Sequence, residues 1–109
     1  MLFFVKAELR RDAGYDRARW LGLVASTWEQ IKQMEADGRV VAGGAFVGQN
    51  AGCVIADVQS HEELSQLINR LPVSAMVSWD VIPMIPADSA LQAAKWALGQ
   101  GAAPAGNGR

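Results

Sequence analysis

The segment MLFFVKAELR, residues 1–10, alternates along the chain as a half-buried β-strand does. Its odd-numbered residues from Phe3 to Leu9 are apolar and need a hydrophobic core on one side. The even-numbered residues begin apolar, at Leu2 and Phe4, and end charged. A sheet built on this strand would carry helices on one face and a partly apolar surface on the other. We therefore expect a second subunit to cover that other face.

Length and charge are those of a single globular domain. The 109 residues are 50% hydrophobic and 19% charged, outside the range of disordered proteins. With 10 basic and 11 acidic residues the net charge is -1, so neither nucleic acid nor an anionic membrane surface is an expected partner. The basic segment at residues 10–19 is diluted by aspartates and is predicted to be a solvated loop and helix start.

Cysteine content and the first residues bear on location. Cys53 is the single cysteine, so the chain forms no intrachain disulfide. The N-terminal segment lacks the pattern of a signal peptide, and no stretch has the length and apolarity of a membrane span. These features predict a cytoplasmic protein with no membrane partner.

A long helix is predicted from Asp16 to Asp37, ended by Gly38. Trp28 lies at the edge of its apolar stripe and is expected to line a cleft. The stripe, with members three or four residues apart, consists of Trp20, Val24, Thr27, Ile31 and Met34.

Two strands are expected next, at residues 39–47 and 51–58, joined by a hairpin at residues 48–50. Because the connection is short, they should be antiparallel neighbours. Gly43 and Gly44 predict a bulge or bend in the first of them, or a close approach by a ligand or another backbone.

The remaining core elements have clear end signals. Ser60 and Glu63 have the spacing of a capping box at the start of a helix, and Pro72 ends that helix. A final strand is expected at residues 76–84, where Pro83 favours the edge of the sheet.

A further helix is expected after the last strand, capped by Asp88 or Ser89. It would dock either on a neighbouring subunit or on its own domain. Residues 99–109 are rich in Gly, Ala and Pro and predict a flexible tail, so that the domain would span residues 1–98. The thin stripe of this helix consists of Leu91, Ala94, Lys95 and Leu98.

The order strand, helix, strand, strand, helix, strand is typical of a ferredoxin-like α+β fold. It places four antiparallel strands in one sheet, two helices on one face, and an added C-terminal helix. The bare face retains apolar residues, so a symmetric mate is expected to cover it and form a dimeric α+β barrel.

The sequence resembles the muconolactone isomerase family over roughly residues 1–90. The similarity lies in the start MLFFVK, in MEADG before a strand, in DVQSHEELSQLINRLP, and in the hydrophobic-Asp-Val strand that follows. The resemblance implies a dimeric ferredoxin-like barrel with a small-molecule pocket between sheet and helices. It also implies proton-shift isomerisation of an unsaturated lactone, without metal or organic cofactor.

Two residues are candidates for proton transfer or substrate orientation. Lys6 is placed to orient an anionic substrate, the alternative being a solvated lysine whose stem packs on the sheet. Glu29 is a candidate general base, the alternative being a solvent-facing glutamate. His61, in the first turn of a helix, is expected to be exposed, and the residue types give no sign of a protein-built metal site.

Tryptophans are the main candidates for substrate binding. Trp28 and Trp79 would line a pocket for a flat, conjugated ligand, and Trp20 is a third candidate. Asp80 is polar in an apolar strand, so it is either paired, exposed at an edge, or part of the site.

These observations predict a small-molecule enzyme that isomerises an unsaturated lactone or carbonyl compound. A cofactorless monooxygenase with the same barrel architecture is one alternative. A non-catalytic protein for small-molecule binding or assembly is the other.

Overall fold

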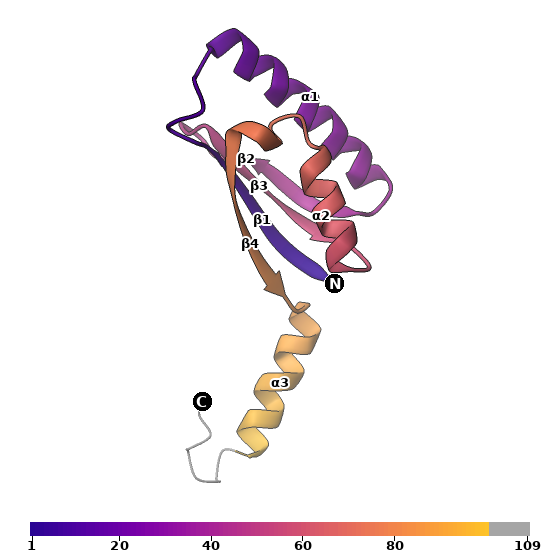
Figure 1. Ribbon diagram of the computed structural model, residues 1–109. Helices are drawn as coiled ribbons and strands as arrows, with labels where there is room; N and C mark the ends of the chain where they lie inside the picture. Colours follow the sequence, from indigo (N-terminus) through magenta and orange to yellow (C-terminus); the bar gives the residue numbers. More distant parts are fainter. Residues whose placement is uncertain (101–109) are drawn as a thin grey trace.

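Four antiparallel strands form one sheet in the computed structural model, which describes residues 1–100 (Figure 1). The order across the sheet is β2-β3-β1-β4, so β1 lies inside and β4 at an edge, as Pro83 predicts. The arrangement confirms the ferredoxin-like α+β fold. The strands are β1 (Leu2–Leu9), β2 (Val40–Ala45), β3 (Ala51–Asp57) and β4 (Val77–Met84).

Two helices, α1 (Arg17–Ala36) and α2 (His61–Arg70), cover the same face of the sheet (Figure 1). A short 3₁₀ helix, η1 (Ser74–Met76), leads from α2 into β4. The helix α3 (Ala87–Gly99) follows β4. The predicted tail, residues 99–109, lies outside the described residues from 101 onward.

The predicted caps define the ends of α1 and α2. Asp16 accepts a hydrogen bond from the amide of Arg19 at 3.3 Å, and Gly38 ends α1 with a φ of 88°. Ser60 accepts from the amide of Glu63 at 3.1 Å. The Glu63 carboxylate accepts from the amide of Gln59 at 2.7 Å, one residue before the cap.

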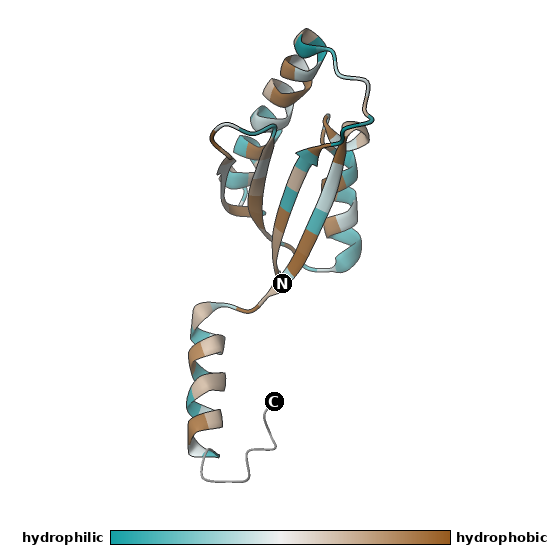
Figure 2. Ribbon diagram, turned by 90° about the vertical axis from the view of Figure 1, so that its left-hand side faces the viewer, coloured by the Kyte–Doolittle hydropathy of each residue, from teal (hydrophilic) through white to brown (hydrophobic). Residues whose placement is uncertain are grey.

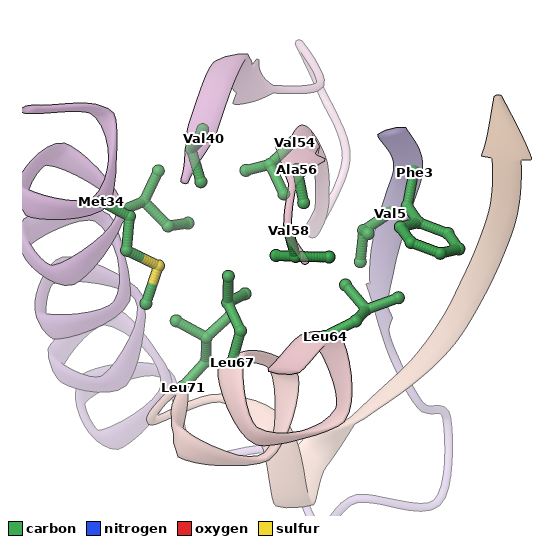
Figure 3. Packing of buried hydrophobic residues seen from close by; sticks show 11 residues of the cluster. Phe3, Val5, Met34, Val40, Val54, Ala56, Val58, Leu64, Leu67 and Leu71 are labelled. Atoms are coloured by element: carbon green, nitrogen blue, oxygen red, sulfur yellow. The ribbon is translucent and has the colours of Figure 1, made fainter. Parts of the chain in front are cut away.

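The core lies between the sheet and the two helices. Figure 3 shows side chains from β1, β2 and β3 pointing toward those of α1 and α2. Phe3 and Val5 of β1 are 3% and 2% exposed, so the odd-numbered side of β1 faces the core as its alternation predicts. The buried cluster comprises Phe3, Val5, Ile31, Met34, Val40, Val54, Ala56, Val58, Leu64, Leu67 and Leu71.

The irregularity in β2 is displaced from the predicted position. The register with β3 shifts between Val40 and Ala42, just before the paired glycines. A methyl group on Gly43 would lie 2.7 Å from the carbonyl oxygen of Cys53. Gly43 therefore marks a close approach of the β3 backbone, one of the alternatives that the sequence left open.

The last helix differs from the sequence prediction in its cap and its packing. Pro86 occupies the cap position, and neither Asp88 nor Ser89 accepts a capping hydrogen bond, because both lie inside the first turn. Every residue of α3 is exposed, including Trp96 at 69%. Figures 1 and 2 show α3 extending away from the sheet, so docking on its own domain is not what the structure shows.

Candidate functional site

A cavity of about 250 Å³ lies between α1 and the helix-covered face of the sheet. Engineered apolar cavities of roughly 150 Å³ hold benzene, so this volume accommodates one substituted ring. Its wall is almost entirely apolar. The side chains from α1 that line it are those of Trp20, Leu21, Val24, Thr27, Trp28 and Ile31.

Small residues on the sheet make the room for this cavity. Ala45, Gly52 and Ala7 are cross-strand partners in one row across β2, β3 and β1. The same row continues to Trp79 on β4. Because residues of one row share a face, three nearly side-chain-free positions form a floor with an indole at one end.

The structure gathers all three predicted substrate-binding tryptophans around this cavity. Trp20 and Trp28 enter from α1, eight residues or about two turns apart, and Trp79 enters from β4. Trp20 is 5% exposed, whereas Trp28 and Trp79 are only partly buried. Their role in binding substrate stays a prediction.

The polar groups at the cavity are neutral. Thr27 is 6% exposed and its hydroxyl accepts a hydrogen bond from the amide of Val73 at 3.3 Å. Gln49 and Asn50, from the hairpin between β2 and β3, contribute amides. Cys53 borders the cavity but is the register partner of Lys6, so strand alternation points its thiol to the other face of the sheet.

A shallow depression of about 410 Å³ adjoins the cavity, because Gln49 and Asn50 line both. The carbonyl of Asn50 accepts a hydrogen bond from the amide of Leu9 at 2.9 Å, which fixes the hairpin beside the end of β1. The other lining residues are Glu8, Leu9, Arg10, Arg11 and Tyr15. Charged and phenolic side chains therefore lie at the polar end of an apolar cavity.

Sequence reasoning missed this depression. Residues 10–19 were expected to be only a solvated loop and helix start. The available signal was the pair Arg10 and Arg11 directly after a strand. This pair lies near the hairpin at residues 48–50 only because β1 and β3 are antiparallel, which puts the hairpin at the same end of the sheet. The sequence of residues 10–19 alone does not show this.

Lys6 and Asp80 lie on the opposite face of the sheet from the cavity. They are direct cross-strand partners on β1 and β4. The ammonium of Lys6 is 3.9 Å from a carboxylate oxygen of Glu8 and 5.9 Å from the ring centroid of Phe46. Asp80 is exposed on the edge strand, the second of the three options that the sequence allowed.

Glu29 and His61 are both exposed. Glu29 is next to Trp28 in α1 but does not line the cavity. The His61 ring packs edge-on against Phe3, with ring centroids 5.6 Å apart. The structure therefore does not bring the predicted base Glu29 together with Lys6 or with the tryptophans.

Two further features of residues 1–100 complete the description. No three His, Cys, Asp or Glu side chains in this part of the chain gather as metal ligands do. Hydrogen bonds from Arg39 hold the pKa of the Asp37 carboxyl below its ordinary value, at the turn between α1 and β2. This turn is separate from the cavity, whose lining includes neither residue.

The fold and the cavity together define a ferredoxin-like α+β protein with a partly open, mostly apolar pocket of small-molecule size. The sequence profile of muconolactone delta-isomerase matches residues 1–90. The chain belongs to this family, as the resemblance indicated.

Solved structures show the same fold. A crystal structure of muconolactone isomerase matches with 24% identity and a TM-score of 0.68, over 79% of this chain and 90% of that chain. The 5-chloro-2-hydroxyhydroquinone dehydrochlorinase of Burkholderia phenoliruptrix AC1100, in complex with 2,5-dihydroxybenzoquinone, matches with 13% identity and a TM-score of 0.60, over 82% of this chain and 98% of that chain. Among curated proteins the search found no match.

None of the helices within residues 1–100 combines the length and apolarity needed to cross a membrane.

Proposed function

We propose that this protein is a cofactor-independent enzyme that shifts a proton in a small, flat, unsaturated lactone or carbonyl compound. The observation that carries the proposal is the apolar cavity under α1, lined by Trp20, Trp28 and Trp79. Indole rings offer large flat apolar surfaces, which suit a conjugated ring. Membership in the muconolactone delta-isomerase family supports the reaction type.

A proton shift needs one group that removes a proton beside a carbonyl and another that supports the developing negative charge. The cavity wall supplies neutral groups, so we place both functions in the adjoining depression. Glu8 shares the open face with Lys6 but lines the depression at the end of β1, and it is the proposed base; Arg11 and Tyr15 are the proposed groups for the oxygen. A substrate bound against the indoles would extend its carbonyl toward Gln49 and Asn50.

Glu29 and Lys6 remain candidates from the sequence, and their variants belong in the same experiment. Purified wild type is mixed with muconolactone and a panel of related unsaturated lactones, and the ultraviolet spectrum is followed. We expect E8Q to lose about a hundredfold in rate, the usual loss for a general base. E62Q, which changes an exposed carboxylate on α2, is the matched control.

The outcomes separate the assignments. A large loss in E29Q or K6M with an active E8Q would transfer the role of base or orienting group to those residues. No turnover of any lactone by wild type would refute the isomerase function.

A non-catalytic binding protein is the second candidate. It is favoured by one observation, that the side chains turned into the cavity carry no ionisable group. Binding of flat lactones without any spectral conversion would support it over the enzyme.

We also propose that a second copy of the chain covers the open face of the sheet. Figure 2 shows hydrophobic segments gathered at the end of the sheet from which α3 leaves. On this face Ile82 is 50% exposed, and Lys6 and Asp80 lie side by side. A face that carries both charge signs beside an exposed apolar side chain can pair with a copy of itself.

The oligomeric state tests this second proposal. In sedimentation experiments, wild type should be a dimer or larger, and I82K should shift toward monomer. V47K is the matched control, because Val47 is 98% exposed in the loop between β2 and β3, outside the strands that form the open face. A monomeric wild type at high concentration would refute the proposal.

With Cys53 as its single cysteine the protein suits a reducing compartment, and we propose the cytoplasm.

A further inference from the structure

At Gly52 the side chain of Trp28 from α1 lies directly over the backbone of β3. A methyl group built on Gly52 would lie 3.1 Å from Cζ2 of Trp28. It would also lie 2.9 Å from the carbonyl oxygen of Gly44 and 3.3 Å from Cα of Ala45. The indole of Trp28 therefore packs directly on the backbone of β3, in contact that a side chain at position 52 would prevent.

This contact also places the indole of Trp28 over the floor of the cavity. The floor on either side of Gly52 is made by Ala7 and Ala45, its cross-strand partners. Trp28 lies over one point of this floor and Trp79 lies at the end of the row, so indole rings border the space above it. A ring held against these indoles gains stacking contacts if it is planar and loses them if it is puckered.

We infer that Gly52 is the specificity-determining residue of the site, restricting it to planar ring compounds by letting Trp28 rest against β3. The inference depends on the proposed function, because it assumes that the cavity is where ligand binds. It adds to the preference for flat ligands, which the tryptophans already suggest, the residue on the sheet that sets this preference. A side chain at position 52 would lift Trp28 and occupy the floor.

Gly44 supplies a matched control within the same pair of strands. It is the register partner of Cys53, on the face of the sheet opposite the cavity. A methyl group on Gly44 meets nothing within 4 Å. G52A and G44A therefore add the same atom to neighbouring positions, one inside the cavity and one outside it.

Phenol and cyclohexanol are suitable probes, since they share size and hydroxyl group but differ in planarity. Titration calorimetry measures their affinity for wild type, G52A and G44A, with circular dichroism to check folding. We expect wild type to prefer phenol several-fold, as a ring stacked on indole gains about 0.5–1.5 kcal/mol. G52A should bind phenol about tenfold more weakly, and G44A should bind like wild type.

Each outcome decides between the inference and the function on which it rests. If wild type binds neither probe, the proposed function fails and the inference fails with it. If wild type binds both probes equally, or if G52A keeps the affinity and preference of wild type, only the inference fails. An equal loss in G44A would also overturn it, because the effect would then come from strand distortion.

W28L keeps the test decisive if the close contact with Gly44 prevents G52A from folding. This variant retains Gly52 and removes the indole that packs over it. We expect its affinity for cyclohexanol to rise relative to phenol. An unchanged preference would overturn the inference.

Discussion

Thr27 connects the stability of the fold to the wall of the cavity. Its hydroxyl accepts a hydrogen bond at 3.3 Å from the amide of Val73, on the segment that leads into η1 and β4. The side chain is 6% exposed and also lines the cavity. T27V keeps the shape of the side chain but removes the hydroxyl, so the buried amide of Val73 loses its hydrogen-bond acceptor. An unsatisfied buried amide costs about 1–3 kcal/mol.

T27S separates the hydrogen bond from the packing of the methyl group. It keeps the hydroxyl and loses one buried methyl, worth about 0.8 kcal/mol. Urea unfolding followed by circular dichroism, at one fixed protein concentration, measures both variants. We expect T27V to lose about 1–3 kcal/mol with an unchanged dependence on urea, which corresponds to about 4–8 °C in melting temperature for each kcal/mol.

Two results would contradict the reasoning for Thr27. If T27V is within about 0.5 kcal/mol of wild type, water reaches the amide of Val73 and that end of the cavity is not dry. If T27S loses as much as T27V, packing of the methyl group and not the hydrogen bond is what stabilises the contact.

Three further predictions concern the rest of the fold. Hydrogen bonds from Arg39 lower the pKa of Asp37 in the folded state. The stabilisation from this pair is therefore present above the unfolded pKa of about 3.9 and is lost as pH falls through the lower folded pKa. D37N should remove this part of the acid-range stability profile, as measured by urea unfolding from about pH 2 to 6. S60A should destabilise by about 1 kcal/mol in the same assay, because the Ser60 hydroxyl accepts from a first-turn amide of α2. L67A should lose about 2–5 kcal/mol because Leu67 is 3% exposed, whereas L98A on exposed α3 should stay within about 0.5 kcal/mol of wild type.

The fold was predictable because its signals are local. The alternation of residues 1–10, the cap at Ser60 and the stop at Gly38 each act within a few residues, and the structure agrees with all three. The cap of α3 was the exception. Pro86 sets the start of that helix, and Asp88, two residues later, is too far into the first turn to act as its cap.

The site was only partly predictable, because it depends on pairing between distant strands. Aromatic content pointed to the tryptophans, and the structure gathers Trp20, Trp28 and Trp79. The depression beside them was not visible in the sequence, since residues 8–15 and 49–50 meet only through the register of β1 with β3. The sequence of β3 alone does not show that Gly52 lies under Trp28, which belongs to α1 and comes more than twenty residues earlier in the chain.

Strand parity explains why the titratable candidates and the cavity lie apart. Odd-numbered residues of β1 face the helices, and so do their cross-strand partners on β3 and β4. Lys6 is even-numbered and Asp80 is its partner, so both lie on the open face. Without a shift of β1 by one residue, neither can reach a ligand held under α1. Any acid or base that acts on such a ligand must therefore reach it around the end of the sheet, where the end of β1 meets the hairpin. Glu8 shares the open face with Lys6, but it lies at this end of β1 and lines the depression beside the hairpin, so it is the residue to replace before Lys6.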